Sequence, residues 1–312
     1  MNVWLVVVFL NHKCMLCNLF NAVLHLPSAF RPIPHPRVIM TLLVKDEETL
    51  LEHNLRFHHA MGVDGFIITD NNSTDATPAI IERYRQMGWV LAVIHETGTD
   101  YRQKQWVDRM IDVARREFAA DWIINADGDE FWYPPTGDFH TQLAHLRANV
   151  LRCEVIGMRP EEDIPFTEWR ETAHETAERE ALGLSPYGIF GPHSHKVMHR
   201  AKGYLQISMG NHKVKMLPRW CQASDIRIYH YNHLGRQAFV RKVVNGGEQL
   251  EHNPSRHGGK HWRYFLELYR QGRLPEAYDR VVGTHLVEQL RTLRALRTDT
   301  TMSDWFAAHP ET

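Results

Sequence analysis

Residues 37–135 alternate between short apolar runs and longer segments in which apolar positions recur every three or four residues. Short apolar runs bounded by turn residues are typical of buried strands, and the longer spacing is typical of amphipathic helices. The predicted strands are Arg37–Val44, Gly65–Thr69, Trp89–Ile94 and Asp121–Ala126, and the predicted helices are 50–61, 77–87 and 103–118. This strand–helix alternation predicts a parallel sheet with right-handed crossovers.

Polar residues gather where three of these strands end. The clusters are Lys45–Glu48, Asp70–Asp75 and Asp127–Glu130. Ligands of parallel sheets bind outside the carboxyl ends of the strands. The three clusters therefore predict one binding site at this edge of the sheet.

Asp127 and Asp129 carry the most specific chemistry of the three clusters. Residues i and i+2 of an extended segment project to the same side, so both carboxylates can face one point. Two carboxylates that close repel each other unless a cation or a proton lies between them. Mg²⁺ or Mn²⁺ suits such oxygen ligands and leaves room for phosphate oxygens. The alternative is an acidic turn with Gly128 at the bend.

The rest of the chain predicts shorter strands and further helices. The strands are expected at 195–199, 204–209, 211–217 and 226–231, and the helices at 139–150, 236–250, 262–270 and 281–297. Residues 167–182 are polar and predict an exposed helix or an excursion over the site. Prolines crowd residues 27–36 and mark a linker. We expect an extension and linker at 1–36, a main α/β domain at 37–235, and a helical region at 236–312 packed on it.

Composition excludes some classes of protein. The 312 residues suffice for one large domain or two. The 36 Lys and Arg balance 37 Asp and Glu, so no basic field of the kind that drives nucleic-acid binding is present. The apolar run Val3–Leu10 is too short to span a bilayer. We expect a cytoplasmic protein, with peripheral association at the inner face of a membrane as the alternative.

Zinc chemistry is the alternative to a magnesium or manganese site. Cys14 and Cys17 have CxxC spacing, but the sequence holds no second such pair to complete a zinc site. Histidines are dense in one part of the chain, at His193, His195, His199, His212, His230 and His233. Their spacing matches no metal-binding motif.

The ordered polar clusters resemble the signature of GT-A-type glycosyltransferases. The similar segments are Val44-Lys-Asp-Glu-Glu48, Asp70-Asn-Asn-Ser-Thr-Asp75 and Asp127-Gly-Asp-Glu-Phe131, the last resembling a family-2-like branch with a DxDEF segment. Further on, Ile228–Asn232 and Phe239–Gly247 resemble the closing HY…F…K…G segment of that branch. The resemblance implies a GT-A α/β fold, a Rossmann-like mixed sheet flanked by helices, here with a carboxyl-terminal helical cap.

The resemblance also implies roles for single residues. Asp127 and Asp129 would hold Mn²⁺ or Mg²⁺ on the diphosphate of a nucleotide-sugar donor, and His230 would complete the metal shell. The remaining residues expected to bind the donor are Asp46, Glu47, Asp70, Asn72, Arg102 and Lys104, the first four near the nucleoside and the last two near the diphosphate. His212 is a second candidate at the metal or donor site.

Ordinary structural roles compete with each assignment. Acids such as Asp46 and Glu47 stabilise a helix amino terminus, and Asp70 can cap a turn. Arg102 and Lys104 are also typical of a solvated helix face. His230 is one of 21 histidines.

The general base is the least determined part of the predicted site. An inverting transferase needs an Asp or Glu near the acceptor hydroxyl. Asp163 is the candidate and Glu162 the reserve, because both follow the predicted strand Glu154–Met158. The alternatives are an exposed acidic loop at this position and a retaining mechanism.

The function expected from these residues is metal-dependent transfer of a sugar from a nucleotide-diphosphate donor. The acceptor would be a hydroxyl of a saccharide, a lipid-linked compound or a protein. The alternative is a metal-dependent nucleotidyltransferase or a non-catalytic nucleotide-binding α/β protein. A nucleotidyltransferase would carry a Gly-rich loop where this chain has Lys45–Glu48, and the sequence contains no GxxxxGK[ST] loop.

Overall fold

The computed structural model describes residues 28–96, 103–161, 163–174, 195–251 and 260–310. Four parallel strands form one end of its main sheet: β1 Val38–Val44, β2 Gly65–Asp70, β3 Val90–His95 and β4 Trp122–Asp127. Their spatial order is β3-β2-β1-β4. The connecting helices are α2 Leu51–Ala60, α3 Thr77–Gln86 and α4 Gln103–Arg116. The predicted parallel sheet with helical crossovers is confirmed.

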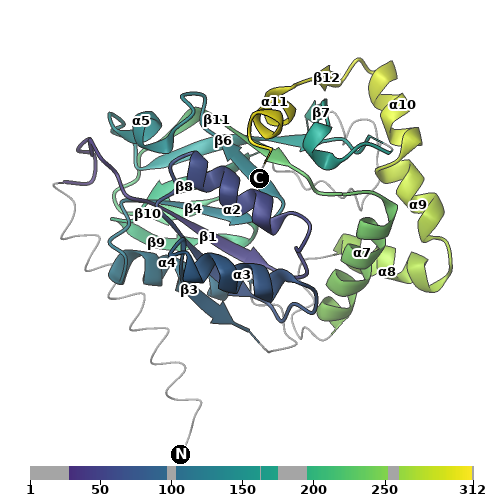
Figure 1. The fold of residues 1–312 in the computed structure, drawn as a ribbon, viewed down its shortest axis with the longest axis horizontal. Coiled ribbons are helices and arrows are strands. Elements are labelled where there is room, and N and C mark those ends of the chain that lie inside the picture. The colour runs from purple at the N-terminus through teal and green to yellow at the C-terminus, as the bar shows by residue number, and fades with distance from the viewer. Residues whose placement is uncertain (1–27, 97–102, 162, 175–194, 252–259, 311–312) are drawn as a thin grey trace, which may run out of the picture.

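Antiparallel strands extend this sheet beyond β4. They are β8 His195–Arg200, β6 Val150–Met158, β7 Glu171–His174 and β12 Leu296–Thr298, in that order. The strand β11, Cys221–His230, pairs parallel with β6 and antiparallel with β5, Glu130–Tyr133. A separate pair consists of β9 Tyr204–Ile207 and β10 Val214–Met216. The result is a mixed sheet flanked by helices, as the resemblance predicts (Figure 1).

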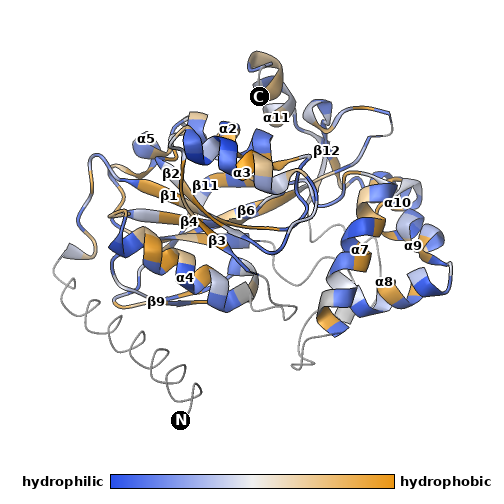
Figure 2. Cartoon of the chain, turned by 60° about the horizontal axis from the view of Figure 1, so that its bottom comes forward, coloured by the Kyte–Doolittle hydropathy of each residue, from blue (hydrophilic) through white to orange (hydrophobic). Residues whose placement is uncertain are grey.

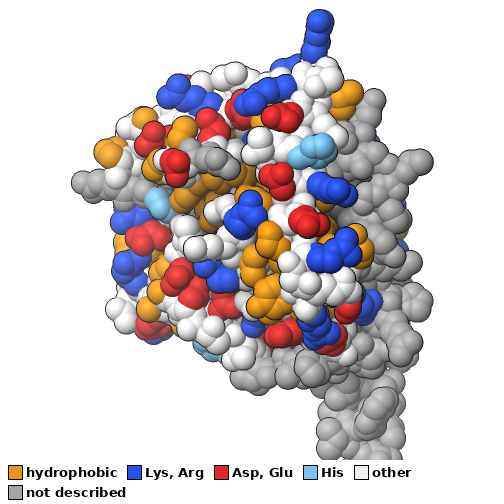
Figure 3. All heavy atoms as spheres, turned by 90° about the vertical axis from the view of Figure 1, so that its right-hand side faces the viewer, with side chains coloured by type: hydrophobic (Ala, Val, Ile, Leu, Met, Phe, Trp, Pro, Cys, Tyr) orange, Lys and Arg blue, Asp and Glu red, His pale blue; other side chains and the backbone are white. Residues whose placement is uncertain are grey.

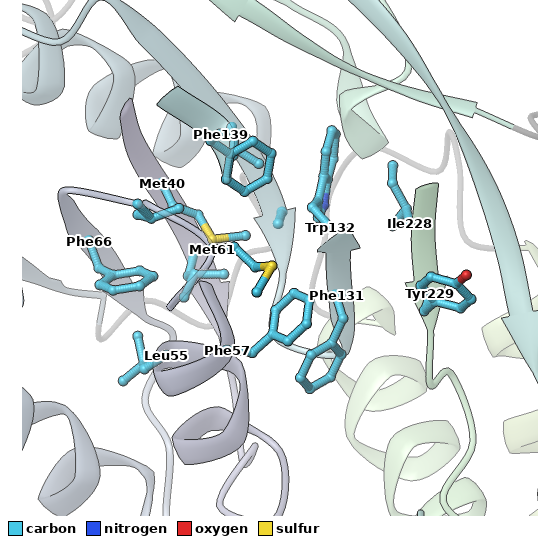
Figure 4. Packing of buried hydrophobic residues seen from close by; sticks show 14 of the residues in the cluster. Met40, Leu55, Phe57, Met61, Phe66, Phe131, Trp132, Phe139, Ile228 and Tyr229 are labelled. Atoms are coloured by element: carbon cyan, nitrogen blue, oxygen red, sulfur yellow. The ribbon is translucent and has the colours of Figure 1, made fainter. Parts of the chain in front are cut away.

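Alternation along the central strands builds two apolar layers. Val38, Met40 and Leu42 of β1 lie in a cluster with residues of α2, α3, β5 and β11, whereas Ile39 lies in a second cluster with residues of α4. Successive side chains of a strand point to opposite faces, so one strand supplies both layers. Figure 2 shows the apolar strands between α2 and α3 on one side and α4 on the other. Figure 4 shows aromatic rings of the first layer meeting between α2, β5 and β11.

The carboxyl-terminal region has two parts. The helices α7 Arg236–Glu251, α8 Lys260–Arg270, α9 Leu274–Val281 and α10 Thr284–Thr292 stand beside the sheet (Figure 1), and α7, α8 and α9 share an apolar cluster around Phe239 and Phe265. The last helix, α11 Thr301–Ala308, packs instead into the first layer of the main core through Met302, Trp305 and Phe306.

Two predicted helices differ from the observed ones. The helix expected at 139–150 ends early, as α5 Phe139–Leu143, because Asn149 is fixed by hydrogen bonds to Pro218 and Trp220 and leads directly into β6. The helix expected at 281–297 is interrupted at Gly283, where a Cβ atom would lie 3.0 Å from the Cα of Asp279. A new helix, α10, begins there and is followed by β12.

The predicted strands of the second half are confirmed in part. Residues 204–209 and 211–217 form β9 and β10, each shorter than predicted, with a 3₁₀ turn at Met209–Asn211 between them. The strand predicted at 226–231 begins earlier, at Cys221. Residues 175–182, half of the polar segment 167–182, lie outside the described residues; the other half contains the strand β7, which lies between β6 and β12.

Two further properties concern the surface. Within the described ranges, no helix combines the length and the apolar character needed to cross a membrane. Lys and Arg side chains intermingle with Asp and Glu over the face that carries α7 to α10 (Figure 3).

Candidate active site

Two loops at the carboxyl edge of the parallel strands are joined by hydrogen bonds. The amide of Asp46 donates to Ser73 Oγ at 3.0 Å, and the amide of Thr74 donates to Asp46 Oδ1 at 2.7 Å. One residue on, the amide of Glu47 donates to Thr77 Oγ1 at 2.8 Å. The clusters that follow β1 and β2 therefore form one structural unit.

The acidic segment lies beside this unit, in the turn between β4 and β5. Asp129 is 3% exposed. Its carbonyl accepts a hydrogen bond from the Tyr231 amide at 2.9 Å. The antiparallel register of β5 and β11 places His230 opposite Glu130. A histidine from the end of β11 thus reaches Asp129, and its Nε2 lies 3.4 Å from Asp129 Oδ1.

Asp129 has a second cationic partner in α7. Lys242 Nζ lies 2.6 Å from Asp129 Oδ2 and also donates to the carbonyl and side chain of Asn232. Burial alone would raise the pKa of Asp129, but Lys242 and His230 outweigh it and hold that pKa well below its usual value. Burial opposes the charge of His230 as well, and the Asp129 carboxylate nevertheless raises the pKa of His230. Asp129 is therefore a fixed negative charge.

Asp127 is paired with a different lysine. Lys196 of β8 lies 2.6 Å from Asp127 Oδ2 and also contacts the carboxylate of Glu130. The register of β4 and β8 pairs Ile124 with Met198, so Lys196, two residues earlier in the antiparallel strand, comes level with the end of β4. Burial raises the pKa of Glu130, and Lys196 offsets part of that rise.

Glu47 brings a further carboxylate to the same place. Gly128 lies directly beside it, since a Cβ on Gly128 would be 3.2 Å from Glu47 Cγ. Burial, followed by the charge of Asp129, raises the pKa of Glu47 to about 8. Without a bound cation, Glu47 therefore holds its proton at neutral pH, and a cation beside it would favour the ionised form.

The helix α2 holds the acidic turn through two buried polar side chains. Asn54 Nδ2 donates to the carbonyls of Gly128 and Glu130, at 3.0 and 2.9 Å, on either side of Asp129. His58 Nδ1 lies 2.8 Å from the Asn54 carbonyl, and His58 Nε2 accepts from the Trp132 amide at 3.0 Å. Asn54 and His58 are four positions apart in the helix, so both lie on the same face of α2.

The structure brings together most of the residues predicted to form the site. Asp129 faces His230, and the charges of Asp129 and Asp127 act on Glu47. Asp46 lies next to them, with its Oδ2 accepting from Asn245 of α7 at 3.0 Å. Asp70 is buried at the end of β2, where it accepts from the Ser73 amide and lies 3.7 Å from His95 Nδ1.

Other predicted residues lie apart or outside the described ranges. Asn72 is exposed, with its carbonyl accepting from Lys45, and Lys104 pairs with Asp108 of its own helix at 2.8 Å. Asp163 is exposed on the loop after β6. His212 contacts the His195 carbonyl. Arg102, Glu162, Cys14 and Cys17 lie outside the described residues.

The sequence did not predict three residues that contact the acidic segment: Lys196, Lys242 and Asn54. Lys242 belongs to the closing segment at 239–247, which resembled the family, so its position was a usable signal. Nothing in the sequence around Lys196 or Asn54 marks either residue, because their partners lie 69 or more positions away in the chain.

The fit of a metal ion depends on two of the three predicted ligands. Asp129 and His230 face each other, and carboxylate and imidazole suit Mn²⁺. Asp127 is turned to Lys196. In the part of the chain that the structure describes, no three His, Cys, Asp or Glu side chains gather in an arrangement that could hold a metal. The residue types fit the ion, and Asp129 with His230 is the pair that would begin such a site.

Part of the chain matches a known protein family. Residues 59–204 match the family model for glycosyl transferase family 2. These residues include β2 to β4, the acidic segment and β8. The search of curated proteins found no match.

Three solved structures are distantly similar to this chain. The mannosyltransferase PcManGT from Pyrobaculum calidifontis, solved with GDP-Man and Mn²⁺, is 14% identical, with 96% of this chain and 90% of that chain covered and a TM-score of 0.40. TarS from S. aureus is 14% identical, with 77% and 49% covered and a TM-score of 0.39, so this chain spans about half of that protein. Glucosyl-3-phosphoglycerate synthase from Mycobacterium tuberculosis, solved with Mn²⁺, UDP and glucosyl-3-phosphoglycerate, is 16% identical, with 53% and 57% covered and a TM-score of 0.30.

At these identities the likenesses concern the fold alone. Residues 59–204, just under half of the chain, are similar to a glycosyl transferase family 2 domain, and this match supports a glycosyltransferase.

Proposed function

We propose that this protein transfers a sugar from a nucleotide-diphosphate donor to an acceptor hydroxyl at the edge formed by the ends of β1, β2 and β4. The observation that carries the proposal is the buried Asp129 held between His230 and Lys242, with Glu47 and Asp127 beside it. Fixed charges of both signs at one point suit a reaction in which charge moves from a sugar to a phosphate.

In the proposed reaction the acceptor oxygen bonds to the anomeric carbon of the sugar. The bond from that carbon to the phosphate oxygen breaks, and the nucleoside diphosphate leaves with the electron pair. Lys242, at the mouth of the site with a third of its side chain exposed, would neutralise the charge that builds on the departing diphosphate. Asp70 and the loop at Asp46 and Glu47 would hold the nucleoside.

A divalent ion is part of the proposal. Mn²⁺ or Mg²⁺ held by Asp129 and His230, with Asp127 as the third ligand, would supply further stabilisation of the diphosphate charge. The acceptor proton would pass to a carboxylate, for which Asp163 and Glu162 remain the predicted candidates. The acceptor itself is proposed only as a hydroxyl of a saccharide, a lipid-linked compound or a protein.

Binding and product analysis test this proposal. Thermal unfolding is measured with UDP, GDP, UDP-glucose and GDP-mannose, each with Mn²⁺, Mg²⁺ or EDTA. We expect at least one nucleotide to raise the melting temperature, since a ligand that binds only the folded state stabilises it, and we expect EDTA to remove the shift. A shift in melting temperature that survives EDTA would indicate that Lys196 and Lys242, and not a metal ion, neutralise the charge of the diphosphate. No shift with any nucleotide would contradict the proposal.

The products distinguish transfer of a sugar from transfer of a nucleotide. Sugar transfer or donor hydrolysis releases a nucleoside diphosphate, whereas a nucleotidyltransferase would release pyrophosphate. We expect Asp129→Asn to abolish release of the nucleoside diphosphate and the metal-dependent shift, with the far-UV circular dichroism unchanged. The matched control is Asp225→Asn, an exposed carboxylate on the same strand as His230, which should behave as wild type. Full activity in Asp129→Asn would remove Asp129 from the site.

A further inference from the structure

His233 is a buried histidine beside the candidate site with unmet hydrogen-bonding capacity. It follows β11 by three residues and is 2% exposed. Neither ring nitrogen has a hydrogen-bond partner among the described residues. Leaving buried polar atoms unpaired costs about 1–3 kcal/mol each. Native proteins rarely do so without a functional reason or a bound water or ion.

The surroundings of His233 include charged residues of the candidate site. The charged groups that act on it are Lys242 of α7, Arg159 at the end of β6, His230 and Asp129. One edge of the ring packs against Phe239, with centroids 5.2 Å apart. Burial, then the charges of Lys242 and Arg159, hold the pKa of His233 well below its usual value. The imidazole is therefore neutral.

A neutral imidazole selects its ligand by hydrogen-bonding type. One nitrogen donates and the other accepts. A phosphate oxygen would satisfy only the donor, and a metal ion only the acceptor. Hydroxyl groups both donate and accept, so the hydroxyls of a sugar ring satisfy both nitrogens.

We infer that His233 binds hydroxyls of the transferred sugar while its diphosphate lies toward Lys242 and Asp129. This inference rests on the proposed function. His233 is 2% exposed, so we infer that Lys242, whose side chain is 33% exposed, moves aside when the sugar binds. Phe239 is the apolar neighbour of the His233 ring. The two ring nitrogens of His233 would make the polar contact with the sugar hydroxyls.

The test compares two ligands that differ only by the sugar. Affinities for UDP and UDP-glucose, and for GDP and GDP-mannose, are measured by calorimetry in the wild type and in His233→Phe. We expect His233→Phe to bind the nucleotide sugar about tenfold more weakly, which corresponds to the loss of one or two hydrogen bonds, and to bind the nucleoside diphosphate as the wild type does. The melting temperature of the variant without ligand should not fall, because no hydrogen bond among the described residues is lost.

Two further variants keep the result interpretable. His233→Asn retains a donor and an acceptor and should recover part of the sugar-dependent affinity. His199→Phe is the matched control: His199 is also fully buried, but Asn125 and the Arg200 carbonyl contact its nitrogens. It should lose stability and keep the affinity difference between nucleotide sugar and nucleotide.

The outcomes separate the inference from the proposed function. Unchanged affinities in His233→Phe would overturn the inference and indicate a buried water as the partner of His233. An equal loss for both ligands would overturn it too, since the contact would then be to the diphosphate or to the fold. If the wild type binds neither nucleotides nor nucleotide sugars, the proposed function itself fails.

Discussion

The hydrogen bonds of His58 depend on the protonation state of its ring. Its Nε2 accepts from the Trp132 amide while its Nδ1 donates to the Asn54 carbonyl. This pattern requires the neutral ring, because a protonated imidazole has no acceptor. Burial lowers the pKa of His58 from 6.5 to about 3. Protonation of His58 is therefore coupled to unfolding.

The first prediction follows from the sign of this shift. Between pH 6.5 and about 3 the unfolded chain binds a proton at residue 58 that the folded chain does not. The contribution of His58 is thus fully present above pH 6.5, and it falls by about 1.4 kcal/mol per pH unit as the pH decreases through this window. Chemical denaturation of wild type and His58→Gln between pH 4.5 and 8 measures it.

His58→Gln can donate and accept but does not titrate. We expect the variant to be less stable than the wild type at pH 8 and to lose less stability on acidification. Carboxylates that titrate in the same range are common to both proteins and cancel in the difference. Equal slopes for the two proteins would show that residue 58 is protonated in the folded state.

At the residue scale, the sequence predicted the aspartates of the site but not the lysines that contact them. Asp127, Asp129 and His230 were predicted because local spacing and family resemblance mark them. Lys196 and Lys242 lie 69 and 113 positions from the aspartates they contact. Such pairs are created by strand register and helix docking, which one sequence does not reveal. The roles of Asp163 and Asn72 stay predictions.

At the scale of elements, α2 acts as a brace for the acidic turn. Its apolar residues Leu51, Leu55 and Phe57 lie in the first core layer, while Asn54 and His58 carry hydrogen bonds through that layer to β5 and the turn before it. The position of Asp129 is therefore set by a helix that contributes no charge to the site.

The second prediction is that Asn54→Asp impairs both stability and catalysis. The substitution keeps the shape but removes both N–H donors, so the carbonyls of Gly128 and Glu130 lose a partner and face a carboxylate. We expect a loss of about 2–4 kcal/mol in the free energy of unfolding and a fall in kcat measured under conditions where the variant is folded.

Asn149→Asp is the control for this prediction. Asn149 is equally buried, and it donates to the Pro218 carbonyl at 2.7 Å and accepts from the Trp220 amide at 2.8 Å, where β6 begins. This variant should lose comparable stability and keep its kcat. Similar kcat losses in both variants would mean that α2 has no special role in positioning Asp129.

The elements themselves were predicted best where the apolar pattern is local. The four parallel strands and their helices follow from runs such as Ile67–Ile68 in β2 and the spacing in α2. The pattern misled at 139–150, where Leu146 and Val150 continue a helical spacing although Asn149 is held by distant carbonyl and amide groups. Tertiary hydrogen bonds outweighed local propensity at that point.

At the scale of the whole molecule, the helix near the carboxyl terminus packs into the main core. The helix α11 near the carboxyl terminus packs against α2 and the turn Phe166–Glu168 through an aromatic cluster. The ring of Phe306 lies 5.8 Å from that of Phe131, the residue after Glu130. Tyr231, the residue after His230, contacts the same Phe131 ring at 5.2 Å. The acidic segment therefore rests on a cluster that the last helix completes.

The third prediction is that Phe306→Ala destabilises the molecule as a whole and also loosens the site. Deleting a buried phenylalanine ring costs about 3–5 kcal/mol, and the cavity would lie against Phe131. We expect a single cooperative unfolding transition at lower denaturant concentration, and a smaller rise in melting temperature with a bound nucleotide than in the wild type. Ala307→Ser, at the exposed neighbouring position, should change stability by less than about 0.5 kcal/mol. Separate melting of a small unit in Phe306→Ala, with nucleotide stabilisation unchanged, would show that α11 is an appendage and not part of the core that supports Asp129.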